Sequence, residues 1–227
     1  MAGIWKKWIL DLLFPPKCIF CGDLAEDMIC AKCAAKLPET GDAAKEEVES
    51  GLACVSPLYY EGGVRESLLR FKFEDYRHYA KGYAPLLARA AALELGGEFD
   101  LVSWVPVSEK RRRERGYDQA ELLARELCRL WETEPLRTLC KTVHTAAQSG
   151  ITAAAERRAN VLGVYEAVNR EQWEGKRVLL VDDILTTGAT VAEAARTLRF
   201  AGAKEVCVLT VAKGREAKKK NVMETKT

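Results

Sequence analysis

The sequence predicts an α/β fold, in which a doubly wound, mostly parallel sheet follows a small N-terminal cysteine-rich module. Three apolar runs of β-forming residues, at 100–107, 176–181 and 205–212, alternate with helical patterns. This alternation is typical of parallel strands whose two faces are covered by helices. A length of 227 residues allows one main core and a small appendage. With 35 basic and 33 acidic residues the net charge is +2, so nothing global marks a nucleic-acid or membrane protein.

The chain opens with a short amphipathic pattern. Residues 4–14 mix aromatic and aliphatic side chains with Lys6, Lys7 and Asp11, and the apolar run is too short to span a membrane. There is also no small-residue cleavage site of a signal peptide. We expect a helix that packs on the body of the protein, and an interfacial membrane anchor is the rival interpretation.

Four cysteines then form two C-x-x-C pairs, at Cys18 and Cys21 and at Cys30 and Cys33. Each pair can present two thiolates to one tetrahedral ion, and a full set of four protein ligands leaves no open position for water. Since so few residues cannot build a core alone, we predict a structural zinc ion. A redox dithiol is the alternative, and either use of the cysteines suits a reducing cytoplasm.

The composition also suggests boundaries. Residues 38–50 are acidic and poor in large apolar residues, as a linker or a surface helix would be. We therefore expect an N-terminal helix and zinc ribbon at 1–50, the main domain at 51–215 and a basic, flexible tail at 216–227. The other four cysteines lack ligand spacing and are expected to be buried small hydrophobes. They are Cys54, Cys128, Cys140 and Cys207.

The main domain reads as alternating elements. We expect strands at 51–60 and 100–107, one that begins at 176 and one at 205–212, and helices at 64–73, 81–95, 119–131 and 191–200. The segment at 108–119 is rich in arginine and lysine between positions 110 and 115 and is too charged to belong to the core. In doubly wound sheets the ligand binds at the carboxyl ends of the strands, so we look for the site there.

The most informative segment is residues 178–190, with the sequence VLLVDDILTTGAT. An apolar strand leads to adjacent carboxylates and then to a hydroxyl-rich turn at the start of a helix. Free backbone N–H groups and the positive end of the helix dipole bind phosphate at such a turn. Gly188 allows a backbone conformation that a side chain would obstruct. Asp182 and Asp183 can accept hydrogen bonds from two neighbouring sugar hydroxyls.

This segment is similar to the signature of type I phosphoribosyltransferases, which hold phosphoribosyl pyrophosphate (PRPP) by its ribose hydroxyls and 5'-phosphate. The resemblance implies a catalytic role for the two aspartates. The predicted PRPP ligands are Asp182, Asp183, Thr186, Thr187, Gly188, Ala189 and Thr190. The residues of a P-loop, of an aspartyl phosphatase and of a dinucleotide-binding loop are missing. An ordinary strand, turn and helix with a solvated acidic pair is the alternative.

The arginine-rich segment supplies candidates for the pyrophosphate end of PRPP. Guanidinium groups bind phosphate oxygens in a bidentate manner, so we assign Arg111, Arg113 and Arg115, with Lys72 as a weaker candidate. The acidic pair and this segment both follow strand ends and can face one crevice although about seventy residues lie between them. The alternative is a solvated, charged loop.

Beyond this segment, the chain from about residue 12 to 213 resembles the ComF family (ComFC-like competence proteins), in which a cysteine ribbon precedes a phosphoribosyltransferase-like domain. Four groups of residues carry the resemblance besides the phosphoribosyl segment. They are Leu13-Phe14-Pro15 before the ribbon, Pro106 followed by Arg115-Gly116-Tyr117-Asp118-Gln119, Thr145 with Gln148, and Glu156-Arg157-Arg158-Ala159-Asn160-Val161. Four positions depart from the family pattern: Trp104, Tyr117, Asp118 and Lys141. Asp118 replaces the usual Asn and would put an anion beside pyrophosphate, unless magnesium or an arginine neutralises it.

The resemblance implies a role in natural transformation, in which family members assist the uptake or processing of single-stranded DNA with a helicase partner. We expect a cytoplasmic location, and a DNA-uptake complex is one route by which the protein would associate with a membrane. We expect a Mg2+-dependent phosphoribosyltransferase whose acceptor the motifs do not specify. The alternative is a module that binds PRPP or DNA without turnover, using basic and aromatic side chains such as Lys6, Trp5 and Trp8 to bind the DNA backbone and stack bases.

Overall fold

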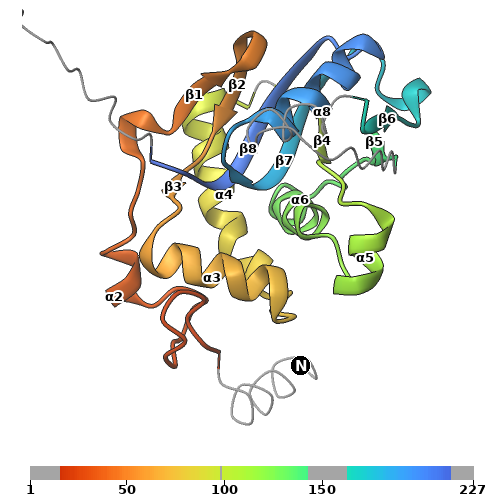
Figure 1. Cartoon of the computed structure of the whole chain (residues 1–227). Coiled ribbons are helices and arrows are strands. Elements are labelled where there is room, and N and C mark those ends of the chain that lie inside the picture. Colours follow the sequence, from red (N-terminus) through yellow and green to blue (C-terminus); the bar gives the residue numbers. More distant parts are fainter. Residues whose placement is uncertain (1–15, 98, 143–162, 216–227) are drawn as a thin grey trace, which may run out of the picture.

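The main sheet of the computed structural model has six strands (Figure 1), and the structure describes residues 16–97, 99–142 and 163–215. The main sheet consists of β1 (Lys45–Val48), β2 (Leu52–Val55), β3 (Leu58–Tyr59), β4 (Leu101–Trp104), β7 (Arg177–Leu185) and β8 (Glu205–Lys213). These strands run in the order β1-β2-β8-β7-β4, and β3 also pairs with β8. All pairings except β1 with β2 are parallel. A separate antiparallel pair joins β5 (Leu139–Lys141) to β6 (Tyr165–Ala167).

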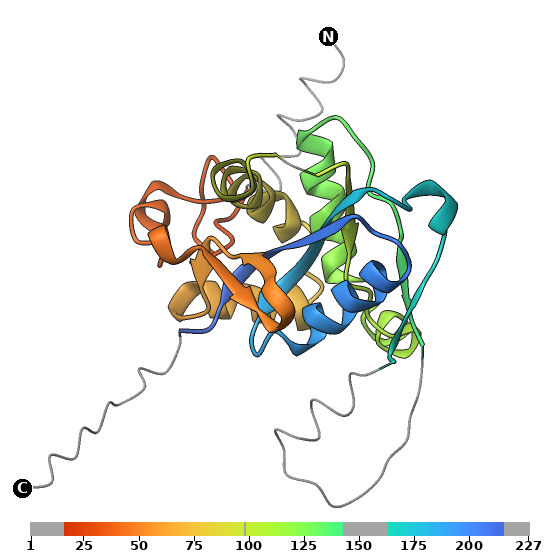
Figure 2. The same cartoon turned by 90° about the horizontal axis from the view of Figure 1, so that it is seen from above.

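Helices cover both faces of this sheet, and Figure 2 shows α4 and α8 on opposite sides of β8. The helices are α2 (Ala31–Ala34), α3 (Gly62–Phe73), α4 (Tyr79–Leu95), α5 (Glu109–Arg115), α6 (Gln119–Leu130) and α8 (Ala189–Phe200), with 3-10 turns at Gly41–Ala43, Glu49–Gly51 and Arg170–Gln172. On one face α4 and α6 pack on β4, β7 and β8, and on the other α8 packs on β7 and β8. The predicted doubly wound, mostly parallel α/β fold is confirmed.

Strand β7 shows why the apolar run is continuous. Leu179 and Val181 belong to the core on the α4 and α6 side, whereas Val178 and Leu180 belong to the core on the α8 side. Successive side chains of a strand point to opposite faces. A strand buried on both faces therefore needs apolar residues at every position, as the sequence pattern predicted.

One predicted strand is divided in the structure, and one helix lies where none was predicted. The strand expected at 51–60 is divided into β2 and β3, because Pro57 has no N–H to donate to a ladder. The carbonyls of Ser56 and Pro57 accept hydrogen bonds from Thr40 Oγ1 at 2.7 and 3.0 Å. The charged segment after Pro106 forms helix α5 and not a loop, since Ser108 caps its first turn and Gly116, at φ +76°, ends it.

Residues 38–50, for which we expected a linker or a surface helix, contain strand β1 of the main sheet. Lys45 pairs with Val55 and Val48 pairs with Leu52 in an antiparallel hairpin. The hairpin joins residues on both sides of the boundary predicted at residue 50. The strand was not predicted because residues 38–50 are rich in acidic residues and alanine, which are depleted in strands on average.

Several predicted features lie outside the described residues. They are the N-terminal helix at 4–14 with Trp5, Lys6, Lys7 and Trp8, the family positions Thr145, Gln148 and 156–161, and the basic tail at 216–227. Within the ranges that the structure describes, no helix has the length and apolar character needed to cross a membrane.

Candidate functional site

The acidic pair lies inside strand β7. Asp182 is in register with Thr210 of β8, and the ladder continues to Leu185, so the prediction that the pair follows the strand end is wrong. Thr186 and Thr187 form the turn, and helix α8 begins at Ala189. The carboxylates therefore lie on β7, and the turn joins β7 to α8. Both elements contribute buried residues to the core.

Gly188 takes the left-handed conformation at φ +75° and is the N-cap of α8. A Cβ atom at this position would lie 2.9 Å from Cγ1 of Val48 in β1. Because glycine has no side chain that could cap the helix, the N–H groups of the first turn remain available for a ligand. Glycine is required here for both conformation and space.

A cavity of about 360 Å³ lies over the carboxyl ends of the parallel strands. Asp183 is on its wall and forms an ion pair with Lys72 of α3, with Nζ 2.9 Å from Oδ1. The other lining residues come from β3, β4, β5, β6, β7, α5, the turn and α8, or from the loops next to them. They are Tyr60, Val105, Pro106, Val107, Arg111, Arg115, Lys141, Tyr165, Asp182, Ile184, Leu185, Thr186, Gly188, Thr190 and Val191.

The carboxyl groups of Asp182 and Asp183 have different electrostatic surroundings. Burial, and then the charge of Asp183, raise the pKa of Asp182 to about 8, although the N–H of Asp183 donates a hydrogen bond to Asp182 Oδ1 at 2.8 Å. Asp183 instead faces the ammonium group of Lys72. A ligand that offers hydroxyl donors or a cation to this pair would favour the ionised form of Asp182.

Most predicted ligands converge on this cavity, but three do not line it. Arg111 and Arg115 reach the cavity from α5. Arg113 lies on the solvent side of the same helix, where its Nε is 3.5 Å from Glu109 Oε1. The side chains of Thr187 and Ala189 are also absent from the lining. A helix of this length presents only one side to the cavity, so alternate arginines cannot all point inward.

Asp118 does not line this cavity and has a structural role at the start of α6. Its Oδ1 accepts hydrogen bonds from the N–H groups of Ala120 at 3.1 Å and Glu121 at 3.3 Å, and its Oδ2 accepts one from Val107 N–H at 2.9 Å. Burial raises the pKa of this carboxyl group, while the three backbone donors favour its ionised form. The carboxylate is an N-cap whose second oxygen also holds the backbone of Val107.

Among the lining residues that were not predicted as ligands, Lys141 and Tyr165 contact each other. Lys141 on β5 lies with Nζ 3.4 Å from the hydroxyl of Tyr165 on β6 and 5.2 Å from its ring centroid. Burial, and then the charge of Arg111, lower the pKa of Lys141. In the sequence Lys141 stood out only as a departure from the family pattern, and nothing local placed its short strand at this cavity.

The four cysteines of the N-terminal module form a second cluster. Their sulfur atoms all lie within 4.8 Å of one another, and Cys21 Sγ and Cys30 Sγ are 3.8 Å apart. A tetrahedral zinc site with Zn–S bonds of about 2.3 Å has sulfur atoms about 3.8 Å apart, so the cluster fits the ion. The N–H of Cys30 donates to Cys18 Sγ at 3.4 Å, as expected for thiolates held in a tight turn.

Arg70 of α3 attaches this module to the main domain. Its Nη2 donates to the carbonyls of Ile19 at 3.0 Å and Phe20 at 2.9 Å, between the first two cysteines. Phe20 and Tyr83 of α4 make an edge contact with ring centroids 6.1 Å apart. The module is thus packed on the same helix that carries Lys72.

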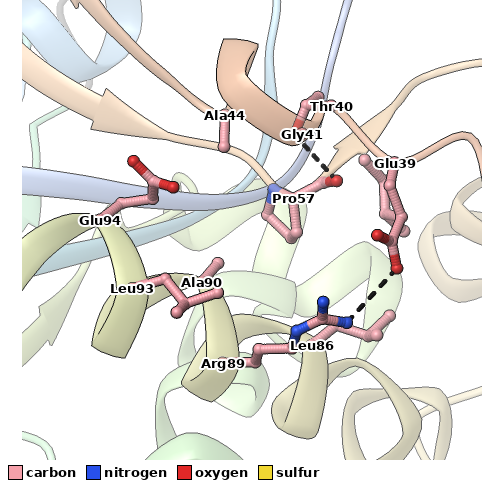
Figure 3. A pocket seen from close by; sticks show the side chains of 11 residues that line it. Glu39, Thr40, Gly41, Ala44, Pro57, Leu86, Arg89, Ala90, Leu93 and Glu94 are labelled. Carbon is pink, nitrogen blue, oxygen red and sulfur yellow. Dashed lines mark hydrogen bonds and ion pairs between the residues drawn. The ribbon is translucent and has the colours of Figure 1, made fainter.

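A smaller hollow lies between α4 and the 3-10 turn at Gly41–Ala43 (Figure 3). Its volume is about 90 Å³, and an ion pair between Arg89 and Glu39, with 3.5 Å between Nη1 and Oε1, crosses its rim. Ligand sites are commonly about 300 Å³ or more. This hollow is therefore too small for a phosphosugar, and the larger cavity is the candidate site.

Comparison with known families identifies the class of the main domain. Residues 114–227 match the phosphoribosyl transferase domain, and residues 9–44 match the double zinc ribbon domain. The chain is therefore a phosphoribosyltransferase-domain protein. The 9–44 region contains four cysteines and no histidine, which is enough for one four-ligand site. The match and the geometry of the cluster together support a structural zinc ion.

Three relatives show which proteins with this domain the chain resembles. Competence protein F of Haemophilus influenzae is 39% identical over 106 residues, 46% of each chain. DNA utilization protein YhgH of Escherichia coli (strain K12) is 34% identical over 113 residues, 48% of this chain and 47% of the relative. Competence protein ComFC of Bacillus subtilis (strain 168) is 28% identical over 139 residues, 61% of this chain and 55% of the relative. These similarities, with the phosphoribosyl transferase domain and the double zinc ribbon domain, support a ComF-family protein.

The matches span about half the length of these relatives. Among solved structures, glutamine PRPP amidotransferase from B. subtilis is similar with a TM-score of 0.41 and 28% identity, covering 59% of this chain and 26% of that chain. The assignment of the fold does not depend on this structure, since the family match and the strand order already define it.

Proposed function

We propose that this protein binds PRPP in the cavity between β7, α5 and α8 and transfers its phosphoribosyl group. The observation that carries the proposal is the convergence of three kinds of group in one cavity. Two adjacent carboxylates suit the ribose hydroxyls. The glycine turn at the start of α8 suits the 5'-phosphate. The cations of α5 and α3 suit the pyrophosphate.

In the proposed assignment, Asp182 and Asp183 hold the ribose hydroxyls, and residues 186–190 hold the 5'-phosphate. Thr187 and Ala189 do not line the cavity with their side chains, so their contribution is through backbone N–H groups. Arg111, Arg115 and Lys72 hold the pyrophosphate, and we add Lys141 to this set because it lines the same cavity.

The reaction is displacement at the anomeric carbon. An acceptor forms a bond to C1 as the C1–O bond to pyrophosphate breaks, and the electron pair of that bond leaves with pyrophosphate. Positioning and electrostatic stabilisation are the main requirements. The carboxylates stabilise positive charge on the sugar, and the cations stabilise negative charge on the leaving group. Mg2+ bound with PRPP would supply further neutralisation of the pyrophosphate.

The biological setting that we propose is the uptake or use of DNA. Relatives bear the names competence protein and DNA utilization protein. A single-stranded DNA ligand and a helicase partner belong to the same proposal and are expected to involve the cytoplasmic side of an uptake complex.

Calorimetric titration of PRPP with and without Mg2+ tests the proposal. We expect binding by the wild-type protein and none by the Asp182→Asn Asp183→Asn variant. Arg111→Met and Arg113→Met form a matched pair, because both arginines belong to α5 but only Arg111 lines the cavity. Loss of a charged hydrogen bond, about 1.5–3 kcal/mol, predicts roughly 10- to 150-fold weaker binding for Arg111→Met and unchanged binding for Arg113→Met.

Three outcomes of these titrations would contradict the proposal or part of it. If the wild-type protein does not bind PRPP, the proposed function is wrong. If the double aspartate variant binds as tightly as the wild type, PRPP lies elsewhere on the molecule. Equal losses for the two arginine variants would mean that general charge, and not the cavity, attracts the ligand.

A further inference from the structure

A second cavity adjoins the candidate site on its arginine side. Its volume is about 490 Å³, and it lies between the C-terminal end of α3 and helix α5. Lys72, Arg111 and Arg115 line both cavities. A ligand held by these three cations can therefore extend from one cavity into the other.

Phe73 gives the second cavity its distinctive chemistry. The side chain is 65% exposed although it is a large hydrophobic residue at the end of a packed helix. The guanidinium carbon of Arg115 lies 5.0 Å from the centroid of its ring, a cation–π arrangement. Arg115 also donates from Nη1 to Gln119 Oε1 at 3.1 Å, which fixes the guanidinium group in place. The result is a partly exposed aromatic surface next to a held, planar cation.

The charges around this surface favour an uncharged planar group over another phosphate. Glu74, Asp75 and Glu114 line the cavity together with its three cations, so the formal charges of the lining balance. The candidate site, by contrast, is lined by four cationic side chains and only two carboxyl groups, and the pKa of one of these, Asp182, is raised to about 8. A phosphate is therefore attracted to the first cavity and repelled by the acidic side of the second. Carboxylates at that side can accept hydrogen bonds from ring N–H or amino groups.

We propose that this second cavity, the Phe73 subsite, binds a nucleobase whose attached phosphate lies on the cations shared with the PRPP cavity. The inference rests on the proposed function, because it uses the same three cations. Aromatic side chains and arginine planes both stack on bases. The base belongs to a mononucleotide or to a single-stranded nucleic acid, and the two sources present the same base-and-phosphate chemistry.

Titration of thymidine monophosphate and of a short oligothymidylate into the full-length, zinc-loaded protein tests the subsite. Stacking of a base contributes about 1–3 kcal/mol, so Phe73→Leu should weaken binding by roughly 5- to 150-fold. Phe73→Trp should retain it. Loss with both ligands assigns the subsite to a free nucleotide, and loss with the oligonucleotide alone assigns it to a nucleic-acid strand.

Phe200→Leu is the matched control. Phe200 is 82% exposed at the end of α8, and Arg196 lies 5.7 Å from its ring centroid, but it lines neither cavity. Its substitution should leave binding unchanged. Equal binding by the wild type and Phe73→Leu, equal losses for the two leucine variants, or no binding of either ligand by the wild type would each overturn the inference.

PRPP titration of the same variants separates this inference from the proposed function. PRPP has no base, so Phe73→Leu should bind it within about twofold of the wild-type affinity. PRPP binding together with unchanged nucleotide binding in Phe73→Leu would refute the subsite and leave the proposed function intact. Failure of the wild type to bind PRPP would refute the proposed function whatever the nucleotide titrations give.

Discussion

Replacement of Gly188 by alanine tests the conformation of the phosphate turn. The residue has φ +75°, and an added Cβ would lie 2.9 Å from Val48 Cγ1 and 3.1 Å from Val48 Cβ. The left-handed backbone costs a residue with a Cβ about 1–2 kcal/mol, and overpacking costs about 1–3 kcal/mol. We therefore expect Gly188→Ala to lower the free energy of unfolding by about 2–5 kcal/mol, out of about 5–15 kcal/mol for a typical domain.

A double-mutant cycle with Val48→Ala separates the two costs. Val48→Ala removes the Cγ atoms that meet the new Cβ, but it leaves the backbone conformation unchanged. In the double variant the overpacking cost should fall, giving a favourable coupling of about 1–3 kcal/mol, while the backbone cost persists. Urea unfolding of the four proteins measures the coupling, and PRPP titration should show weaker binding in both proteins that carry the Gly188→Ala substitution.

Two results would refute this reasoning. If the effects of Gly188→Ala and Val48→Ala simply add, the contact between β1 and the turn is not the source of the cost. If Gly188→Ala unfolds at the same urea concentration as the wild type with the same slope, neither the backbone conformation nor the contact matters. Because α8 packs on the sheet through Val191 and Ala195, the helix itself should persist in every variant.

Two further predictions concern charge and metal. The pKa of Asp182 is raised to about 8 when the protein is folded, above about 3.9 when it is unfolded, so the folded state binds more protons between these values. The contribution of the Asp182 carboxyl group to stability is complete below about pH 4 and is lost as pH rises through about 8. The melting temperature of Asp182→Asn should therefore rise relative to that of the ligand-free wild type between about pH 5 and pH 8. A difference that stays constant over this range would contradict the raised pKa of Asp182. Elemental analysis should find one zinc per chain, and chelation should lower the melting temperature because the module contributes Cys18, Ile19 and Phe20 to the main core; a metal-free protein with unchanged melting would exclude the structural role.

The sequence was most informative where structure is local. The run at 178–181, the acidic pair and the glycine turn indicated strand, turn and helix, because burial on both faces, a left-handed glycine and helix initiation each leave a mark within a few residues. Helix α5 was less evident, since its charges conceal the Ser108 cap and the Gly116 stop that define it. Here the capping residues were more informative than the charge.

Features that depend on distant pairing could not be predicted. Lys141 lines the cavity because β5 pairs with β6 beside α8, and no property of its own segment indicates that. The ion pair between Lys72 and Asp183 joins residues of α3 and β7. Arg113 failed as a prediction for a different reason. Its chemistry suits pyrophosphate, but the period of helix α5 turns its side chain toward solvent.

The hairpin formed by β1 and β2 has a practical consequence for anyone who shortens this chain. A version that starts at residue 51 would keep every predicted PRPP ligand but would lose Val48, which lies next to Gly188 of the phosphate turn, and Glu46, whose carboxylate pairs with the buried Lys213 at 2.8 Å. The edge of β2 would also become an unpaired row of backbone donors and acceptors. Residues far from the motif in sequence thus support it, and an inactive fragment of this kind would say nothing about the activity of the whole protein.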